Sequence, residues 1–230
     1  MGHLGVARLA YAALFLATLV VIAVARFTVA PDFYKTGTDW STAVVGFPSG
    51  AAVIGLAVFA AWRSRQPVLD YLGLVMPRGR VLELLGIAVL TWTMPILWFA
   101  VIAPHYGHMA RPTPLGDGFA LWQVVLIRLE ASVLTPAWEE IIFRGLLYRG
   151  VEKSRLGTAG AVVVTAIAFS LCHFRPSWFD VLYLTCNGIG FALLRARSGS
   201  VLPSMAVHGL VNAMPRSLVS AEWWASLWSA

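Results

Sequence analysis

Apolar segments of about 20 residues recur along this chain of 230 residues and constrain its fold more than any other feature. Each is long enough to cross the hydrocarbon core of a bilayer as a helix. The composition agrees, since 59% of the residues are hydrophobic and 12% are charged, whereas soluble domains carry about 25% charged residues. So little charge cannot cover a soluble globule. We expect an all-α polytopic membrane protein with about seven transmembrane helices, within a range of roughly six to eight.

Loops rich in Arg, Pro and Gly separate the expected spans. The first apolar run is expected to be a retained span rather than a removed signal peptide. The fourth helix is expected to kink near Pro136. The apolar stretch 68–76, between the second and third spans, is expected to lie at the membrane interface. The expected spans are residues 4–25, 42–62, 81–103, 119–148, 157–174, 178–194 and 200–219.

The basic residues number 17 Lys and Arg, giving a net charge of +6. They are scattered between apolar segments without forming a block, which indicates membrane topology and contact with the lipid bilayer, and no nucleic-acid partner. With the N-terminus inside, ten of them fall on the inner side, five on the outer side and two within the fourth helix. We therefore expect a multi-pass protein of the plasma (inner) membrane with a cytoplasmic N-terminus. The inner residues are Arg8, Arg63, Arg65, Arg78, Arg80, Arg149, Lys153, Arg155, Arg195 and Arg197.

The fourth helix carries charged residues that a bilayer strongly disfavours, among them Glu139, Glu140 and Arg144. Glu140 and Arg144 are four residues apart, so they share a helix face and can form an ion pair. Neighbouring residues on a helix point about 100° apart, so one glutamate can pair with Arg144 while the other faces the bundle interior. A desolvated carboxylate of this kind suits a general base. The alternative is a purely structural ion pair that fixes helix packing.

Two further pairs of residues lie in apolar helices at the same spacing: Phe169 with His173, and His208 with Asn212. His208 and Asn212 can present N–H donors to a tetrahedral oxyanion, and His173 can position water or carry a proton. No Ser or Cys is paired with a base, and Cys172 points about 100° away from the adjacent His173. The pattern therefore favours activated water over a covalent intermediate.

A zinc site is the alternative chemistry, with Glu139, His173 and His208 as its ligands. The spacing is not H-E-x-x-H, and the nearby Arg144 would oppose cation binding. We favour a reaction without a cofactor and keep zinc as the alternative.

These three pairs resemble the motifs of the CPBP family, the CAAX-processing and bacteriocin-processing (Abi) membrane endopeptidases. The family patterns are E-E-x-x-x-R, F-x-x-x-H and H-x-x-x-N, in this order. The segment from Gly188 to Pro203 also resembles the family's penultimate helix and turn. The resemblance covers residues 121–214. The matching segments here are Glu139-Glu140-Ile-Ile-Phe-Arg144, Phe169-Ser-Leu-Cys-His173 and His208-Gly-Leu-Val-Asn212.

The resemblance implies a glutamate-dependent endopeptidase whose catalytic site lies inside the helix bundle. It implies that Glu139 activates water with His173, and that His208 and Asn212 form the oxyanion site. We therefore expect the catalytic residues to be Glu139, Glu140, His173, His208 and Asn212, with Glu140 and Arg144 orienting the site. Arg144 and Phe169 are the expected supporting residues, Phe169 through packing. The domain organisation we expect is N-terminal helices and loops at 1–118, a catalytic helical core at 119–219 and a short interfacial tail at 220–230, all in one membrane domain.

The expected activity is hydrolysis of a peptide bond in a membrane-associated or C-terminally anchored, CAAX-like protein or peptide. One alternative is a non-catalytic membrane protein of the same fold, acting as an immunity or scaffold protein. Another is a proton-coupled transporter that uses Glu130, Glu139 and Glu140 as a relay. The transporter is disfavoured because the sequence has no paired broken helices or repeat halves.

Overall fold

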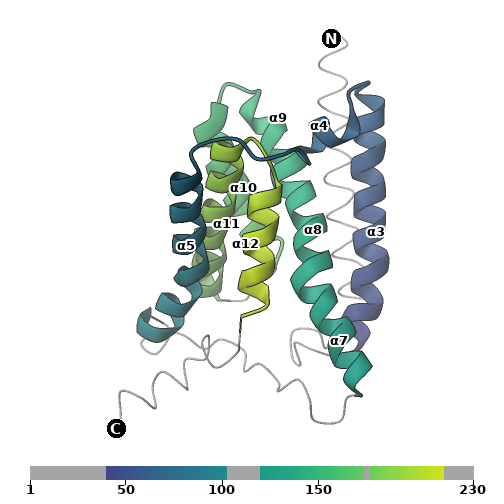
Figure 1. The fold of residues 1–230 in the computed structure, drawn as a ribbon, viewed down its shortest axis with the longest axis vertical. Coiled ribbons are helices and arrows are strands. Elements are labelled where there is room, and N and C mark those ends of the chain that lie inside the picture. Colours follow the sequence, from purple (N-terminus) through teal and green to yellow (C-terminus); the bar gives the residue numbers. More distant parts are fainter. Residues whose placement is uncertain (1–39, 103–119, 174–176, 215–230) are drawn as a thin grey trace.

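The computed structural model describes residues 40–102, 120–173 and 177–214, and every regular element in these ranges is a helix (Figure 1). This confirms the predicted all-α class. Three of the segments, labelled η, are π-helical turns that continue a neighbouring α-helix. The elements are α3 (Trp40–Arg63), α4 (Val68–Leu72), α5 (Val81–Leu97), η1 (Trp98–Ile102), α7 (Leu121–Leu129), η2 (Glu130–Leu134), α8 (Thr135–Glu140), η3 (Ile141–Leu147), α9 (Tyr148–Glu152), α10 (Gly157–Leu171), α11 (Trp178–Ser198) and α12 (Leu202–Asn212).

The helices form a bundle in which α12 lies between α5 and α8 (Figure 1). Helix α11 packs against α5, α10 and α12, and α3 packs against the long helix made by α7 to α9. The short helix α4 joins α3 to the core and contacts η3. Helix α4 lies within the stretch 68–76 that is expected at the membrane interface.

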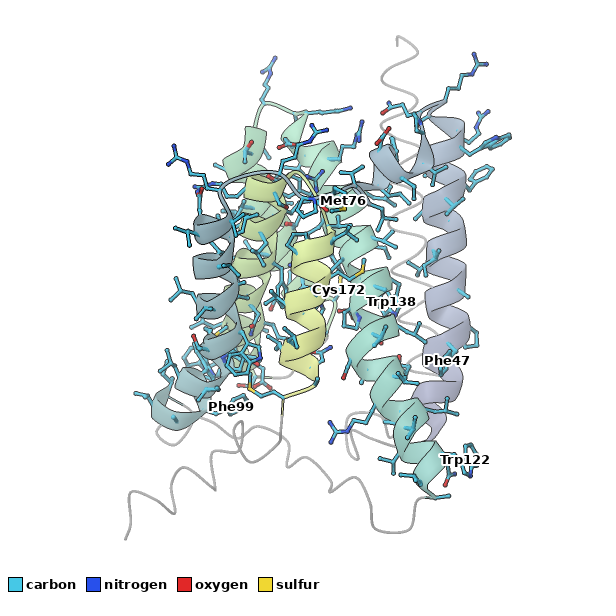
Figure 2. All side chains as sticks on the ribbon, in the orientation of Figure 1. Phe47, Met76, Phe99, Trp122, Trp138 and Cys172 are labelled. Carbon is cyan, nitrogen blue, oxygen red and sulfur yellow. The ribbon has the colours of Figure 1, made fainter. Side chains whose placement is uncertain are left out.

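The outer faces of the bundle are apolar. Among the described helices, Val81–Ile102 is long and apolar enough to cross a membrane, while Gly50–Arg63 and Gly157–Leu171 are apolar but shorter. Only 22% of the most apolar window of Val81–Ile102 is buried inside the protein. Phe47 on α3 and Trp122 on α7 are also exposed (Figure 2). A bundle with this much exposed apolar surface suits lipid better than water, and the count of seven spans stays a prediction.

The fourth helix runs without a break from Leu121 to Glu152, in agreement with the expected start near 119 and an end at 148 or beyond. Instead of a simple proline kink, it contains two π-helical turns, η2 and η3, on either side of α8. In each turn a backbone N–H bonds to the carbonyl five residues earlier, as Thr135 does to Glu130 and Tyr148 does to Phe143. Such turns insert one residue into an α-helix and are frequent at functional sites.

Three predicted helix ends are wrong. Helix α10 ends at Leu171 rather than 174, so His173 lies in the turn after the helix. Helix α11 continues to Ser198 rather than 194, because Gly199 at φ 68° provides the left-handed cap that ends it. Helix α12 ends at Asn212 rather than 219; a proline follows at 215 in the sequence, and helices usually end before one.

Several predictions lie outside the described residues: the first span at 4–25, the loop at 104–118 and the tail at 220–230. The domain boundaries stay predictions for the same reason. Within the described ranges, the basic residues assigned to the inner side lie together at the end of the bundle that carries α4 and α9, where Figure 2 shows Met76. This grouping supports the alternation of sides in the predicted topology.

Candidate active site

Glu140 and Arg144 form a completely buried ion pair in the fourth helix. Arg144 Nη1 donates to Glu140 Oε1 at 3.0 Å, and its Nη2 donates to the backbone carbonyl of Gly188 on α11 at 3.0 Å. The i,i+4 pairing expected from the sequence is therefore present. Because Arg144 also reaches α11, the pair fixes the fourth helix against its neighbour.

His208, from α12, lies between the two glutamates. Its Nδ1 is 3.0 Å from Glu140 Oε1, and its Nε2 is 3.6 Å from Glu139 Oε2. A carboxylate paired with Arg144 accepts hydrogen bonds, so Nδ1 is assigned as the donor to Glu140. Nε2 then faces Glu139, and all three side chains are buried. The sequence placed His208 with Asn212 and did not predict this contact with the glutamates.

His173 lies in the turn just after α10, with its Nδ1 2.7 Å from the carbonyl oxygen of Phe169. A carbonyl oxygen only accepts hydrogen bonds, so Nδ1 carries a proton and Nε2 is the acceptor nitrogen of the neutral ring. Phe169 is buried beneath it. The Phe169 ring centre lies 4.6 Å from that of His173 and 5.5 Å from that of His208.

Phe169 therefore has the packing role expected of it, and it touches all three motifs. The guanidinium carbon of Arg144 lies 4.7 Å from the centre of its ring, which is cation–π geometry. A second aromatic residue, Phe191 on α11, stacks on the His208 ring at 4.6 Å and 18°. Sequence reasoning did not single out Phe191, although it falls within the segment from Gly188 to Pro203 that carried part of the resemblance.

Asn212 lies one helical turn after His208 and donates from Nδ2 to the carbonyl of Ala131 in η2 at 2.9 Å. That carbonyl and the carbonyl of Ser132 lie five and four residues before Pro136, which has no N–H to bond them. Helix α12 packs closely against these two carbonyls: a Cβ on Gly209 would come within 2.5 Å of the Ser132 oxygen. Asn212 thus ties α12 to η2 through its amide, which carries two N–H donors in all.

The zinc alternative needs Glu139, His173 and His208 to converge on one ion. Across the described ranges, no group of three or more His, Cys, Asp or Glu side chains is placed to hold a metal. The buried guanidinium of Arg144 is also next to Glu140. The buried positive charge beside the two glutamates opposes cation binding, and we keep the mechanism without zinc as the favoured one.

Glu130, which the transporter alternative requires, is buried in η2 and accepts a hydrogen bond from Thr135 Oγ1 at 2.6 Å. Glu139 lies beside the other ring nitrogen of His208, with 3.6 Å between its Oε2 and Nε2. The arrangement provides a carboxylate base, imidazole and amide donors, and a positive charge that stabilises the neighbouring carboxylate. These are the parts needed to activate water and to stabilise an oxyanion.

Residues 120–214 match the family model described as "Type II CAAX prenyl endopeptidase Rce1-like". This segment is Rce1-like. The match confirms the resemblance to CAAX-processing proteases that the three motifs indicated, and all seven predicted site residues fall inside it. The comparisons with curated proteins and with solved structures gave no match.

Rce1-like proteins are integral membrane proteases. The family therefore supports peptidase activity, a protein or peptide substrate in a membrane, and a membrane location for this chain. The Rce1-like segment begins at the N-terminal end of α7 and ends just after α12. The helices α3, α4 and α5 lie outside it but pack on it.

Proposed function

We propose that this protein is an intramembrane endopeptidase that hydrolyses a peptide bond near the C-terminus of a membrane-anchored, CAAX-like substrate. Glu139 activates the attacking water. The family match supports protease chemistry. The observation that carries the mechanism is the buried chain in which His208 lies between Glu139 and Glu140, with Glu140 held by Arg144.

In the proposed reaction, Glu139 takes a proton from water as the water oxygen bonds to the substrate carbonyl carbon. The carbonyl oxygen becomes an oxyanion and accepts hydrogen bonds from His208 Nε2–H, in the doubly protonated ring, and from the second N–H of Asn212. The C–N bond then breaks as the proton on Glu139 passes to the leaving nitrogen. His173 orients the water through Nε2, the ring nitrogen opposite the one that bonds the Phe169 carbonyl.

Glu140 and Arg144 support this chemistry without touching the substrate. Glu140 accepts from Nδ1 of His208 and so fixes which ring nitrogen faces Glu139. Phe169 and Phe191 hold the His208 ring on two sides. These contacts orient the donors before substrate binds, which is the main way that enzymes stabilise a developing oxyanion.

The test is cleavage of a prenylated or tail-anchored peptide by the purified full-length protein in lipid. Glu139→Gln and His208→Ala should each lower kcat by about a hundredfold or more, because general bases and oxyanion donors contribute about that much. Glu83→Gln is the matched control, since Glu83 is a partly exposed carboxylate that pairs with Arg197. Equal cleavage by all folded variants would contradict the site assignment.

The same assay separates the alternatives. Activity that survives strong chelation and metal-free purification is expected, and its loss with recovery on adding zinc would favour the zinc mechanism. A folded wild-type protein that cleaves no member of a panel of anchored peptides would favour the non-catalytic scaffold. Proton-coupled uptake into vesicles that Glu130→Gln abolishes would favour the transporter.

A further inference from the structure

A second arginine, Arg195 near the end of α11, is buried next to the site without belonging to any of the three motifs. Its Nε donates to the backbone carbonyl of Arg144 at 3.1 Å. Its guanidinium also lies over the ring of Tyr148, 5.3 Å from the centre. A buried guanidinium is costly unless it is hydrogen-bonded, so these contacts account for its place in the fold.

The bond from Arg195 falls in the π-helical turn η3, where the backbone departs from α-helical hydrogen bonding. Carbonyl groups in such a turn lose the usual partner four residues ahead, and each has two lone pairs to satisfy. Arg195 supplies a donor to one of them. Asn212 does the same at η2, where it donates to Ala131. A side chain from a neighbouring helix thus bonds each of the two turns that flank Glu139 and Glu140.

Helix α11 holds Arg144 at two points. The backbone carbonyl of Gly188 accepts a hydrogen bond from the Arg144 side chain. The Arg195 side chain donates a hydrogen bond to the backbone carbonyl of Arg144. Glu140 binds the same guanidinium. The position of Glu140 therefore depends on Arg144, and the position of Arg144 depends on the bond from Arg195.

The loop after α4 packs against the guanidinium of Arg195. Gly73 adopts φ 72°, and a Cβ there would lie 3.3 Å from Nε and Nη2 of Arg195. The carbonyl of Gly73 also accepts from the backbone N–H of Val201, at the start of α12. This loop closes one side of the guanidinium and links it to the helix that carries His208.

We propose that Arg195 is a positioning residue that holds the π-helical turn η3 in register, and through Arg144 sets the place of Glu140 and His208. It does not touch the substrate. This inference rests on the proposed peptidase function for its kinetic consequence. Its structural consequence, the order of η3, does not depend on that function.

The test compares Arg195→Met, Arg195→Lys and Arg197→Met in the full-length protein in lipid. Arg195→Met should lower kcat about ten- to a hundredfold with KM within about twofold, because small misplacements of catalytic groups have effects of this size. Arg195→Lys keeps a donor and should recover part of the loss. Arg197 is the matched control: it lies two residues on, is more than half exposed and pairs with Glu83, and its variant should match the wild type.

Hydrogen exchange of the amides in residues 141–149 provides a readout independent of activity. Arg195→Met should speed exchange there, while exchange in α5 stays unchanged. If the wild type cleaves nothing, the proposed function fails, and exchange in this segment alone decides the role of Arg195. Unchanged exchange and unchanged kcat in Arg195→Met would overturn the proposal. So would a loss of activity that merely follows a uniform loss of folded protein, or a Lys variant no better than Met when both are folded.

Discussion

Arg144 is the buried charge on which the site depends most directly, since its guanidinium contacts Glu140, Gly188 and the face of Phe169. Removing one partner of a buried ion pair leaves the other charge desolvated without compensation. Arg144→Met should therefore lower the free energy of unfolding by about 3–5 kcal/mol. The double variant Glu140→Gln/Arg144→Met should recover much of this loss, because it removes both charges. Reversible denaturation in mixed micelles measures both.

The exposed pair of Arg197 and Glu83 is the control for this prediction. Breaking it should change the free energy of unfolding by less than about 1 kcal/mol, since water screens exposed pairs. A double variant that is no more stable than Arg144→Met alone would contradict the prediction. Both substitutions remove groups from the site, so the measurement is of stability and not of activity.

At the residue scale, the sequence singled out candidate residues but predicted few of the contacts that they make. Glu139, Glu140 and Arg144 stand out because charge is rare and costly in an apolar helix, and the spacing of Glu140 and Arg144 predicted their pairing. The contact of His208 with Glu140 joins residues 68 positions apart, and helical periodicity carries no information about such contacts. Phe191 escaped notice because a phenylalanine in an apolar helix is ordinary.

At the scale of elements, η3 packs closely against α4. A Cβ on Gly145 would come within 2.8 Å of the carbonyl oxygen of Leu72, so Gly145→Ala must separate η3 from this loop. We expect it to lower the free energy of unfolding by about 1–3 kcal/mol, the usual cost of overpacking. It should also lower peptidase activity, because η3 carries Arg144.

Gly150→Ala is the matched control, five residues further along the same helix, with open space around the position. There the change should be neutral or raise the free energy of unfolding by about 0.5–1 kcal/mol, since alanine favours helices over glycine. Thermal unfolding of both variants in the same lipid tests the pair. Equal midpoints for the two variants would show that the contact with Leu72 does not constrain η3.

Helices were predictable from apolar runs, but their register and ends were not. In a π-helical turn, a backbone N–H bonds to the carbonyl five residues earlier instead of four. This difference does not change the spacing of apolar residues, so the sequence does not predict it. Pro136 predicted a disturbance, and the structure resolves it as a π-helical turn whose freed carbonyls face Asn212 and Gly209. The expected sixth span ends at residue 194 and leaves Arg195 in the following turn, yet Arg195 lies within α11, where it contacts Tyr148 and the Arg144 carbonyl.

In the described bundle, the apolar surface and the basic residues occupy different regions, as a membrane protein requires. The outer faces of helices such as α5 expose large apolar side chains, and the basic residues of α3, α9 and α11 gather at one end with α4. Arg149 links α9 to α4 at this end, because its side chain donates hydrogen bonds to the backbone carbonyls of Asp70 and Tyr71. The side chains of Glu139, Glu140, Arg144 and His208, on α8, η3 and α12, are buried within the bundle.

This arrangement predicts the orientation of the protein in its membrane. Basic loops are retained on the cytoplasmic side, so a reporter fused after Arg155, in the turn between α9 and α10, should report cytoplasmic. A fusion at Ser177, at the opposite end of α10, should report the other side, because one apolar helix separates the two positions. Paired reporters that are active only in the cytoplasm or only outside it give opposite signals at each site. Both fusions on one side would mean that α10 does not cross the bilayer, and exchanged sides would reverse the topology.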